Sequence, residues 1–221
     1  MIPLKDNIKG RSFPFVNILL ILLNGAIFYL EIRQPSPKAL MAFLGQWSLV
    51  PGNLIRNPAF EWIKILSSMF LHGGWMHFLG NMLYLWIFGD NVEDRMGHRR
   101  YLIFYLLVGS CAALSQVCLN PHSTLPLIGA SGAIAGVMGA YFILFPKAKI
   151  TALVPIWIFI RFIEIPAILF LGFWFLLQAL QSWGSILNAS AGGSEMGGVA
   201  WWAHAGGFLA GFLFVIPFKK R

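Results

Sequence analysis

Residues 128–145 read IGASGAIAGVMGAYFILF, an apolar segment with no charged side chain. In a helix, Gly132, Gly136 and Ala140 fall on one face, because positions four apart are neighbours. Faces of small residues let two helix backbones touch in lipid. At about 1.5 Å per residue, positions 131–145 make roughly 22 Å of helix, against a hydrocarbon core of about 30 Å. The segment therefore predicts a short, closely packed helix that the preceding stretch must bring to depth.

The composition of the whole chain points to a membrane protein. Hydrophobic residues make up 58% and charged residues 11% of the 221 positions, and the mean hydropathy is +0.72. Soluble domains average roughly 45–50% apolar and about 25% charged residues. Apolar windows fall at positions 13–30, 75–88, 101–119, 131–145, 165–183 and 201–218. We therefore expect an all-α polytopic membrane protein with six transmembrane helices, folded as a single domain over residues 1–221.

The distribution of positive charge sets the expected orientation. Of the sixteen Lys and Arg residues, only Arg33, Lys38, Arg56 and Lys64 lie in the first loop, and the third and fifth loops have none. By the positive-inside rule both termini are cytoplasmic, and the long first loop, 31–74, faces outward. The net charge of +8 reflects this topology and contact with anionic lipid, so we expect no nucleic-acid partner.

The first window has two interpretations. A basic stretch precedes it, as in a cleaved signal peptide. A retained helix is favoured, because the window is long for a signal and no small-residue cleavage site precedes Glu31. The loop that follows is interrupted by prolines, and apolar stretches such as 39–44 predict short helices lying in the membrane interface.

Among the polar residues inside the apolar windows, four carry the functional argument, because polar groups there are costly and usually functional. His77 and Asn81 are four residues apart in the second window and share a helix face. Ser131 opens the fourth window, and His204 lies near the start of the sixth. Taken alone, Asn81 is more often an interhelical hydrogen-bonding residue than part of an active site. The presence of all four polar residues in the apolar windows is what requires a functional explanation.

Helical rise places these residues at one depth. Ser131 is fourteen residues before Phe145, His204 is fourteen before Phe218, and His77 is twelve before Gly89. At about 1.5 Å per residue they lie roughly 21, 21 and 18 Å above the inner boundary of a core of about 30 Å. All three therefore fall roughly 10 Å beneath the outer surface, as an assembled site requires.

The short fourth window gives this level access to water. Residues 119–129 must carry irregular backbone down to Ser131, and such backbone is tolerated at depth only inside protein or beside a water-filled cavity. A serine at a helix N-terminus also lies among unpaired amides, which favour a developing oxyanion. A serine and a histidine in this setting indicate a hydrolase. A metal pair of His77 and His204 is disfavoured because no cysteine or carboxylate lies at their level, and we expect no cofactor.

Three blocks of sequence resemble the rhomboid family of intramembrane serine proteases. They are His77-x-x-x-Asn81, Gly129-x-Ser131-Gly132 and Ala203-His204-x-x-Gly207-x-x-x-Gly211, in the family's order and on the matching windows, with residues 71–76, LHGGWM, also typical. The resemblance extends over most of the chain through the six-span layout. Gly-x-Ser-Gly alone is a weak signal, whereas three ordered blocks form a strong one.

The resemblance implies a role for each matching residue. Ser131 is the nucleophile, and His204 is its general base and later acid, in a dyad without a third carboxylate. His77, Asn81 and the backbone N–H of Ser131 form the oxyanion hole, with Gly129 shaping the loop before it. Four glycines allow the serine and histidine helices to pack closely, namely Gly132, Gly136, Gly207 and Gly211.

The sequence departs from the family pattern at two places. Some members carry an aromatic residue one turn after the serine, which packs on the histidine ring, and here that position is Ala135. His204 must therefore be oriented by other contacts. The first loop reads Trp62-Ile63-Lys64 where the family often has a Trp-Arg pair, which affects the anchoring of the loop and leaves the proposed chemistry untouched.

The resemblance implies an endopeptidase that cuts single-span or polytopic membrane proteins near the outer face, through an acyl-enzyme. Its compact form favours a prokaryotic plasma membrane, and nothing in the sequence indicates an oligomeric state. Two other classes stay open. A rhomboid-like protein without activity binds membrane clients, although such proteins lack the serine or the histidine. A small-solute transporter also gathers polar groups at one depth, although neither an inverted repeat nor an intramembrane acidic residue is evident.

Overall fold

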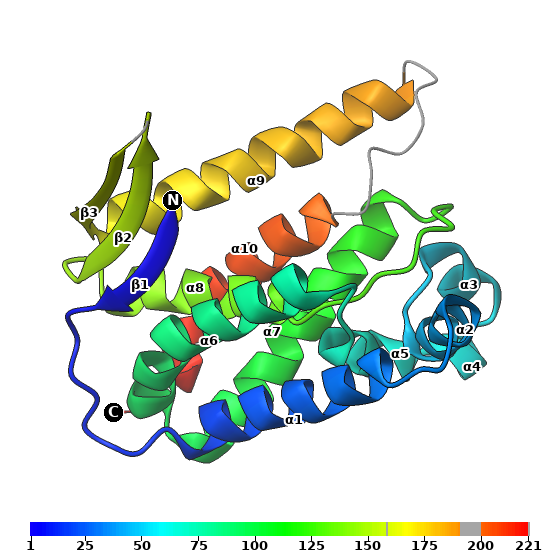
Figure 1. Cartoon of the computed structure of the whole chain (residues 1–221), viewed down its shortest axis with the longest axis horizontal. Helices are drawn as coiled ribbons and strands as arrows, with labels where there is room; N and C mark the ends of the chain where they lie inside the picture. The colour runs from blue at the N-terminus through cyan, green and yellow to red at the C-terminus, as the bar shows by residue number, and fades with distance from the viewer. Residues whose placement is uncertain (158, 191–199, 221) are drawn as a thin grey trace.

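The computed structural model describes residues 1–157, 159–190 and 200–220. In these residues the chain forms a bundle of long helices, a group of short helices at one end of the bundle and a small sheet at the other (Figure 1). The long helices are α1 (Phe15–Ile32), α6 (Trp75–Met96), α7 (His98–Leu119), α8 (Ser131–Leu144), α9 (Ala167–Ser190) and α10 (Trp201–Phe218). The short ones are α2 (Pro37–Trp47), α3 (Pro51–Arg56), α4 (Pro58–Glu61), α5 (Lys64–Ser67) and the 3₁₀ turn η1 (Ser68–Phe70).

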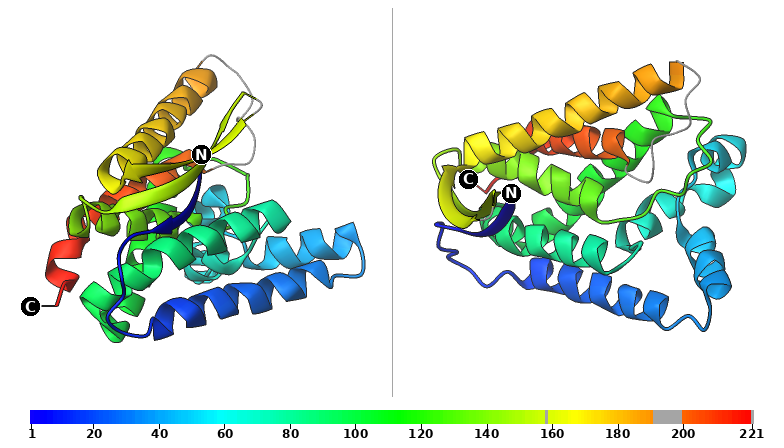
Figure 2. Two further views of the ribbon diagram at one scale, coloured as in Figure 1. Left: turned by 60° about the vertical axis from the view of Figure 1, so that its left-hand side comes forward. Right: turned by 45° about the horizontal axis from the view of Figure 1, so that its top comes forward.

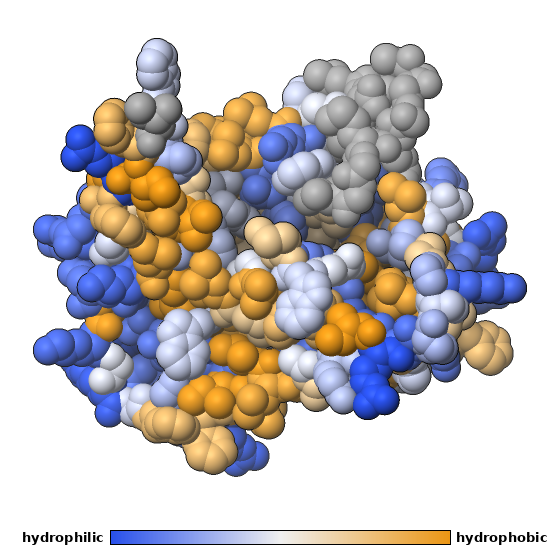
Figure 3. Space-filling view, in the orientation of Figure 1, coloured by the Kyte–Doolittle hydropathy of each residue, from blue (hydrophilic) through white to orange (hydrophobic). Residues whose placement is uncertain are grey.

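Each predicted window corresponds to one long helix, and 201–218 coincides with α10. Four of the described helices, α1, α7, α9 and α10, are long and apolar enough to cross a membrane, and α8 is a shorter apolar helix. Hydrophobic residues cover the middle of the face seen in Figure 3, and hydrophilic residues gather toward its two ends. The helices thus make a polytopic membrane protein, while the count of six spans and the cytoplasmic termini stay predictions.

The expectation of an all-α fold is wrong, because the chain also contains an antiparallel sheet in the order β1-β2-β3. Its strands are β1 (Ile2–Asp6), β2 (Lys149–Ile156) and β3 (Phe159–Pro166), with Ile2 opposite Leu153 and Lys149 opposite Pro166. The fifth window accordingly begins too early, since positions 165 and 166 end β3 and α9 starts at Ala167.

Packing of one sheet face on the bundle explains the strands. Ile150 and Ala152 are fully buried, whereas Arg161, Phe162 and Glu164 on the edge strand are exposed. Composition hides this arrangement, because a continuous apolar run has no clear period and reads equally as a buried strand or as helix. The sheet, the N-terminal strand and the end of α10 all lie at the same end of the bundle (Figures 1 and 2).

The centre of the bundle is α8, which is buried from Ala133 to Tyr141. It packs most extensively on α10, and the two backbones nearly touch. A Cβ added at Gly207 would lie 2.2 Å from the carbonyl oxygen of Gly132, and one at Gly211 would lie 1.8 Å from that of Gly136. The four glycines of the sequence motif therefore meet one another across this helix pair.

A buried carboxylate ties α1 to α6. Glu93, 1% exposed, accepts hydrogen bonds from the backbone N–H groups of Val16 (2.9 Å) and Asn17 (2.7 Å) in the first turn of α1. These amides have no partner within their own helix, and a negative charge is favourable beside them. The Asn17 side chain continues the link by donating to the carbonyl of Leu85 (3.0 Å) and accepting from the Tyr101 hydroxyl (2.9 Å). These hydrogen bonds link α6, the helix that carries His77 and Asn81, to α1 and through Asn17 to α7.

Candidate active site

The segment before α8 reaches the bundle by pairing with the first loop. Leu127 exchanges two backbone hydrogen bonds with Leu49, of 2.7 and 3.2 Å, and the N–H of Gly129 donates to the carbonyl of Ser68 at 2.9 Å. Backbone groups at depth need such partners, because lipid provides none. The first loop therefore supplies the partners that this irregular chain needs before Ser131, through Leu49 between α2 and α3 and Ser68 in η1.

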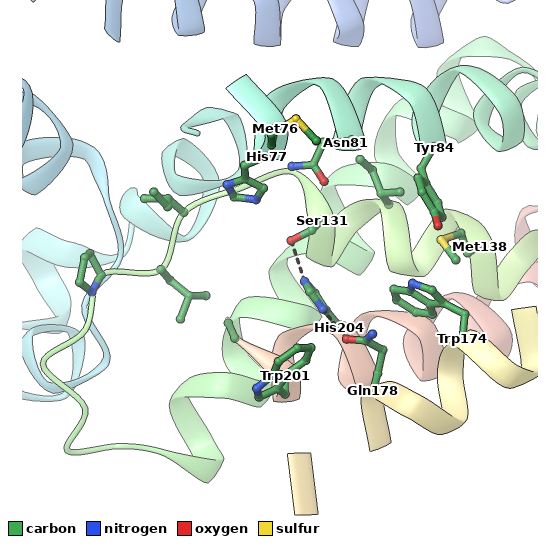
Figure 4. Close-up of a pocket in the computed structure, with 16 residues that line it drawn as sticks. Met76, His77, Asn81, Tyr84, Ser131, Met138, Trp174, Gln178, Trp201 and His204 are labelled. Carbon is green, nitrogen blue, oxygen red and sulfur yellow. Dashed lines mark hydrogen bonds between the residues drawn. The ribbon is translucent and has the colours of Figure 1, made fainter. Parts of the chain in front are cut away.

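Ser131 and His204 meet at the first turns of α8 and α10. The Ser131 hydroxyl Oγ lies 2.8 Å from Nε2 of His204, within hydrogen-bonding distance (Figure 4). Seventy-three positions separate the two residues in the chain. The close approach of the α8 and α10 backbones brings them together, because the glycine contacts begin within one turn of the pair, at Gly132 and Gly207, and continue at Gly136 and Gly211.

The second nitrogen of His204 is held by a residue that the sequence motifs do not include. Nδ1 of His204 lies 2.7 Å from the side-chain oxygen Oε1 of Gln178, which α9 carries and which is 8% exposed. The rings of Trp174 and Trp201 lie 6.0 and 6.2 Å from the His204 ring, centroid to centroid. With alanine at position 135, these three side chains are contacts that orient the His204 ring. Gln178 is a polar residue inside the fifth window, and that is the signal that could have found it.

His77 lies against the loop that precedes the serine. Its Nδ1 is 3.4 Å from the backbone N–H of Gly73, which donates to it. A neutral imidazole carries one proton, so Nε2 is the protonated nitrogen and serves as a donor. Gly129 has φ +122°, and a Cβ there would lie 2.7 Å from His77 Nε2 and 3.5 Å from Ser131 Oγ. Only glycine allows both this conformation and the approach of the His77 ring.

Asn81 presents a buried donor to the same space. Its side chain is 8% exposed, and its Nδ2 finds no acceptor among the described residues. Buried polar groups nearly always have hydrogen-bond partners, so an unpaired one at a cavity wall calls for a functional reason. The Ser131 backbone N–H belongs to the first turn of α8, whose amides have no partner within the helix. Three N–H donors therefore surround the space next to the serine.

His72 stands behind His77. The two rings are 5.2 Å apart, centroid to centroid, and the backbone N–H of His72 donates to both carboxylate oxygens of Glu31, at 3.0 and 3.2 Å. Burial, with a smaller contribution from nearby His77, lowers the pKa of His72 to about 4. His72 is therefore neutral at ordinary pH and supports the cavity wall from outside it.

Ser131, His204 and the side chains around them line one cavity of about 470 Å³, which Figure 4 shows. Its walls come from α6, residues 126–128, α8, α9 and α10. The polar groups Ser131, His204, His77 and Asn81 gather at one part of it, and most of the other lining side chains, such as Met138, are apolar. A cavity of this size and character accommodates a short stretch of peptide.

The fold and site define a helical membrane protein with a serine and a histidine hydrogen-bonded inside the bundle, and the comparison with known families agrees. Residues 59–221 match the family model described as "Rhomboid domain". The chain belongs to the rhomboid family. Together with the apolar helices, this membership makes it an integral membrane protein.

Individual relatives are similar at modest identity. The chain is 31% identical over 156 residues to "Rhomboid protein 1, mitochondrial" of Saccharomyces cerevisiae, covering 69% of this chain and 40% of the relative. It is 39% identical over 80 residues to "Rhomboid protease GluP" of Bacillus subtilis, covering 36% and 15%. It is 27% identical over 132 residues to "Putative rhomboid protease YdcA" of the same organism, covering 59% and 62%. The matched region spans less than two thirds of each relative.

Proposed function

We propose that this chain is an intramembrane serine endopeptidase. The observation that carries the proposal is the 2.8 Å hydrogen bond between Ser131 Oγ and His204 Nε2 beside a cavity inside the bundle. A hydroxyl becomes an effective nucleophile when an adjacent base takes its proton. Family membership and the protease names of the Bacillus subtilis relatives support the same class of activity.

In the proposed reaction, Ser131 Oγ attacks the carbonyl carbon of the scissile peptide bond while His204 Nε2 accepts its proton. The tetrahedral intermediate collapses as His204 returns that proton to the leaving amine, which gives an acyl-enzyme. Water then attacks the ester, again with His204 as the base, and releases the second product. The cavity beside the serine gives water a place in this second step.

The oxyanion of each intermediate would be stabilised by the three donors next to Ser131. These are the unpaired Nδ2 of Asn81, the Nε2–H of His77 and the Ser131 backbone N–H. Each well-placed donor in such a hole is worth about 3–4 kcal/mol in the transition state. The donors are held by α6 and α8 before any substrate arrives, so little reorganisation accompanies the reaction.

The substrates we propose are transmembrane segments of single-span or polytopic membrane proteins, cut near the outer face. A helical peptide bond is shielded by its own backbone, so the segment must unwind to place an extended stretch in the cavity. The membrane that we propose for this activity is the plasma membrane of a prokaryote.

The test compares the purified wild-type chain with Ser131→Ala and His204→Ala on a panel of single-span membrane proteins. Both variants should lose cleavage and covalent labelling by a fluorophosphonate. Ser115→Ala is the matched control, because among the described residues this hydroxyl bonds the carbonyl of Cys111 in its own helix and no group of the cavity. Normal cleavage by Ser131→Ala would overturn the dyad, and wild-type chain that neither cleaves nor labels would favour a client-binding protein or a transporter.

A further inference from the structure

We propose that Gln178 is a positioning residue that holds His204 in the protonation state and orientation the reaction needs. The inference rests on the proposed function and adds a third member, an amide, to the Ser131–His204 pair. It starts from the 2.7 Å contact between Gln178 Oε1 and His204 Nδ1, on the side of the ring away from the serine.

The two contacts of the imidazole together select one tautomer. A neutral imidazole has one N–H, and Nε2 must be without a proton to accept from the Ser131 hydroxyl. Nδ1 then carries the proton and needs an acceptor, which the Gln178 side-chain oxygen supplies at 2.7 Å. Without that acceptor, the proton can sit on Nε2 instead, where it prevents the ring from acting as the base. Selecting the tautomer is the role that the buried carboxylate has in soluble triads.

An amide suits this position better than a carboxylate because of where it lies. Gln178 is 8% exposed, and no Asp or Glu is among the described residues that line the cavity. Burying an unpaired charge in such surroundings is costly, whereas a hydrogen-bonded amide presents the same acceptor without a net charge. The amide dipole still favours the imidazolium that forms during the reaction.

The contact between Gln178 and His204 also makes the geometry of the Ser131–His204 pair depend on the position of α9. Gln178 and Trp174 are one turn apart on α9, and both lie against His204, as Figure 4 shows. Ser131 lies on α8 and His204 on α10, so the contact of Gln178 with His204 comes from a third helix. The orientation of His204 is therefore set by where α9 stands as well as by the two catalytic helices.

The first experiment removes the acceptor with Gln178→Leu and compares it with Gln181→Leu, the same substitution on an exposed position of α9. A buried neutral hydrogen bond corresponds to about a ten- to hundredfold effect. We expect Gln178→Leu to lower kcat for a model transmembrane substrate by that factor with KM changed less than twofold, and to slow fluorophosphonate labelling equally. Equal activity of the two variants, or a loss confined to KM, would overturn the proposal.

The second experiment restores the acceptor with Gln178→Glu and records the pH profile of kcat/KM. A carboxylate beside the ring stabilises the imidazolium, so the acidic limb should move to higher pH by about one unit or more. Activity on the alkaline side should exceed that of Gln178→Leu. An acidic limb at the wild-type pH in Gln178→Glu would overturn the proposal, even if Gln178→Leu fails to fold. Retained cleavage by Ser131→Ala would instead refute the dyad itself, so the two failures are distinguishable.

Discussion

Replacing Gly211 by alanine is expected to move Ser131 and His204 apart without changing either side chain. In the structure a Cβ at this position would lie 1.8 Å from the carbonyl oxygen of Gly136, 2.5 Å from its carbonyl carbon and 2.7 Å from its Cα. All three atoms belong to backbone at the centre of α8, so no side chain can turn aside. The helices must move apart.

The size of the movement follows from those distances. Real Cβ contacts shorter than 3.0 Å are essentially not observed, so the nearest contact must lengthen from 1.8 Å by about 1.2 Å. Gly211 is seven residues from His204 on α10, and Gly136 is five from Ser131 on α8. A rigid displacement of either helix takes the 2.8 Å Ser131–His204 contact to about 4 Å, beyond hydrogen bonding. Misplacement by about 1 Å costs on the order of a hundredfold in rate.

We therefore expect Gly211→Ala to lower kcat/KM for a transmembrane substrate about a hundredfold and to slow fluorophosphonate labelling by a similar factor. Gly184→Ala on α9 is the matched control, because a Cβ there meets nothing within 4 Å. Thermal unfolding in detergent checks that both variants fold. Wild-type labelling by a folded Gly211→Ala protein would refute the reasoning that the glycine contacts set the distance between the serine and the histidine.

Three further predictions concern residues in and around the cavity wall. Gly129→Ala forces a side chain into φ +122° and to within 2.7 Å of the His77 ring, so we expect a ten- to hundredfold loss of kcat, and unchanged kinetics would contradict this role of the loop. Asn81→Ala removes a proposed oxyanion donor and should cost about a hundredfold in kcat with KM nearly constant, while a change in KM alone would assign Asn81 to substrate binding. His72, with a pKa of about 4 when folded against an ordinary 6.5, stays neutral while the unfolded chain binds a proton. The free energy of unfolding should therefore fall by about 3 kcal/mol as the pH drops from 6.5 to 4, and His72→Phe should lack that part of the decrease in denaturant titrations.

The sequence predicted the helices well where a long apolar run coincided with one buried element. Positions 201–218 form α10 as expected, and positions 131–145 form α8 to within one residue. It failed at positions 149–166, where the runs are apolar but the chain forms two strands. Apolar composition does not choose between strand and helix, and here that choice depends on β1 and on the bundle surface that the sheet covers.

For the candidate site, sequence motifs singled out the residues whose types are unusual in an apolar chain. Ser131, His204, His77 and Asn81 all line the cavity. Gln178 escaped notice because one glutamine in an apolar window belongs to no motif, and its importance lies in a contact with a residue 26 positions away.

What the sequence determined by itself is therefore the membrane setting, the number and order of the long helices and the unusual polar residues that line the cavity, because hydrophobicity and residue type are local properties. The tertiary structure alone decided which of those residues touch. It set the 2.8 Å approach of Ser131 to His204 through glycine contacts between α8 and α10, and it brought Gln178 from α9 to the far side of the imidazole. Such contacts depend on how helices pack against one another, and packing is a property of surfaces that only the folded chain possesses.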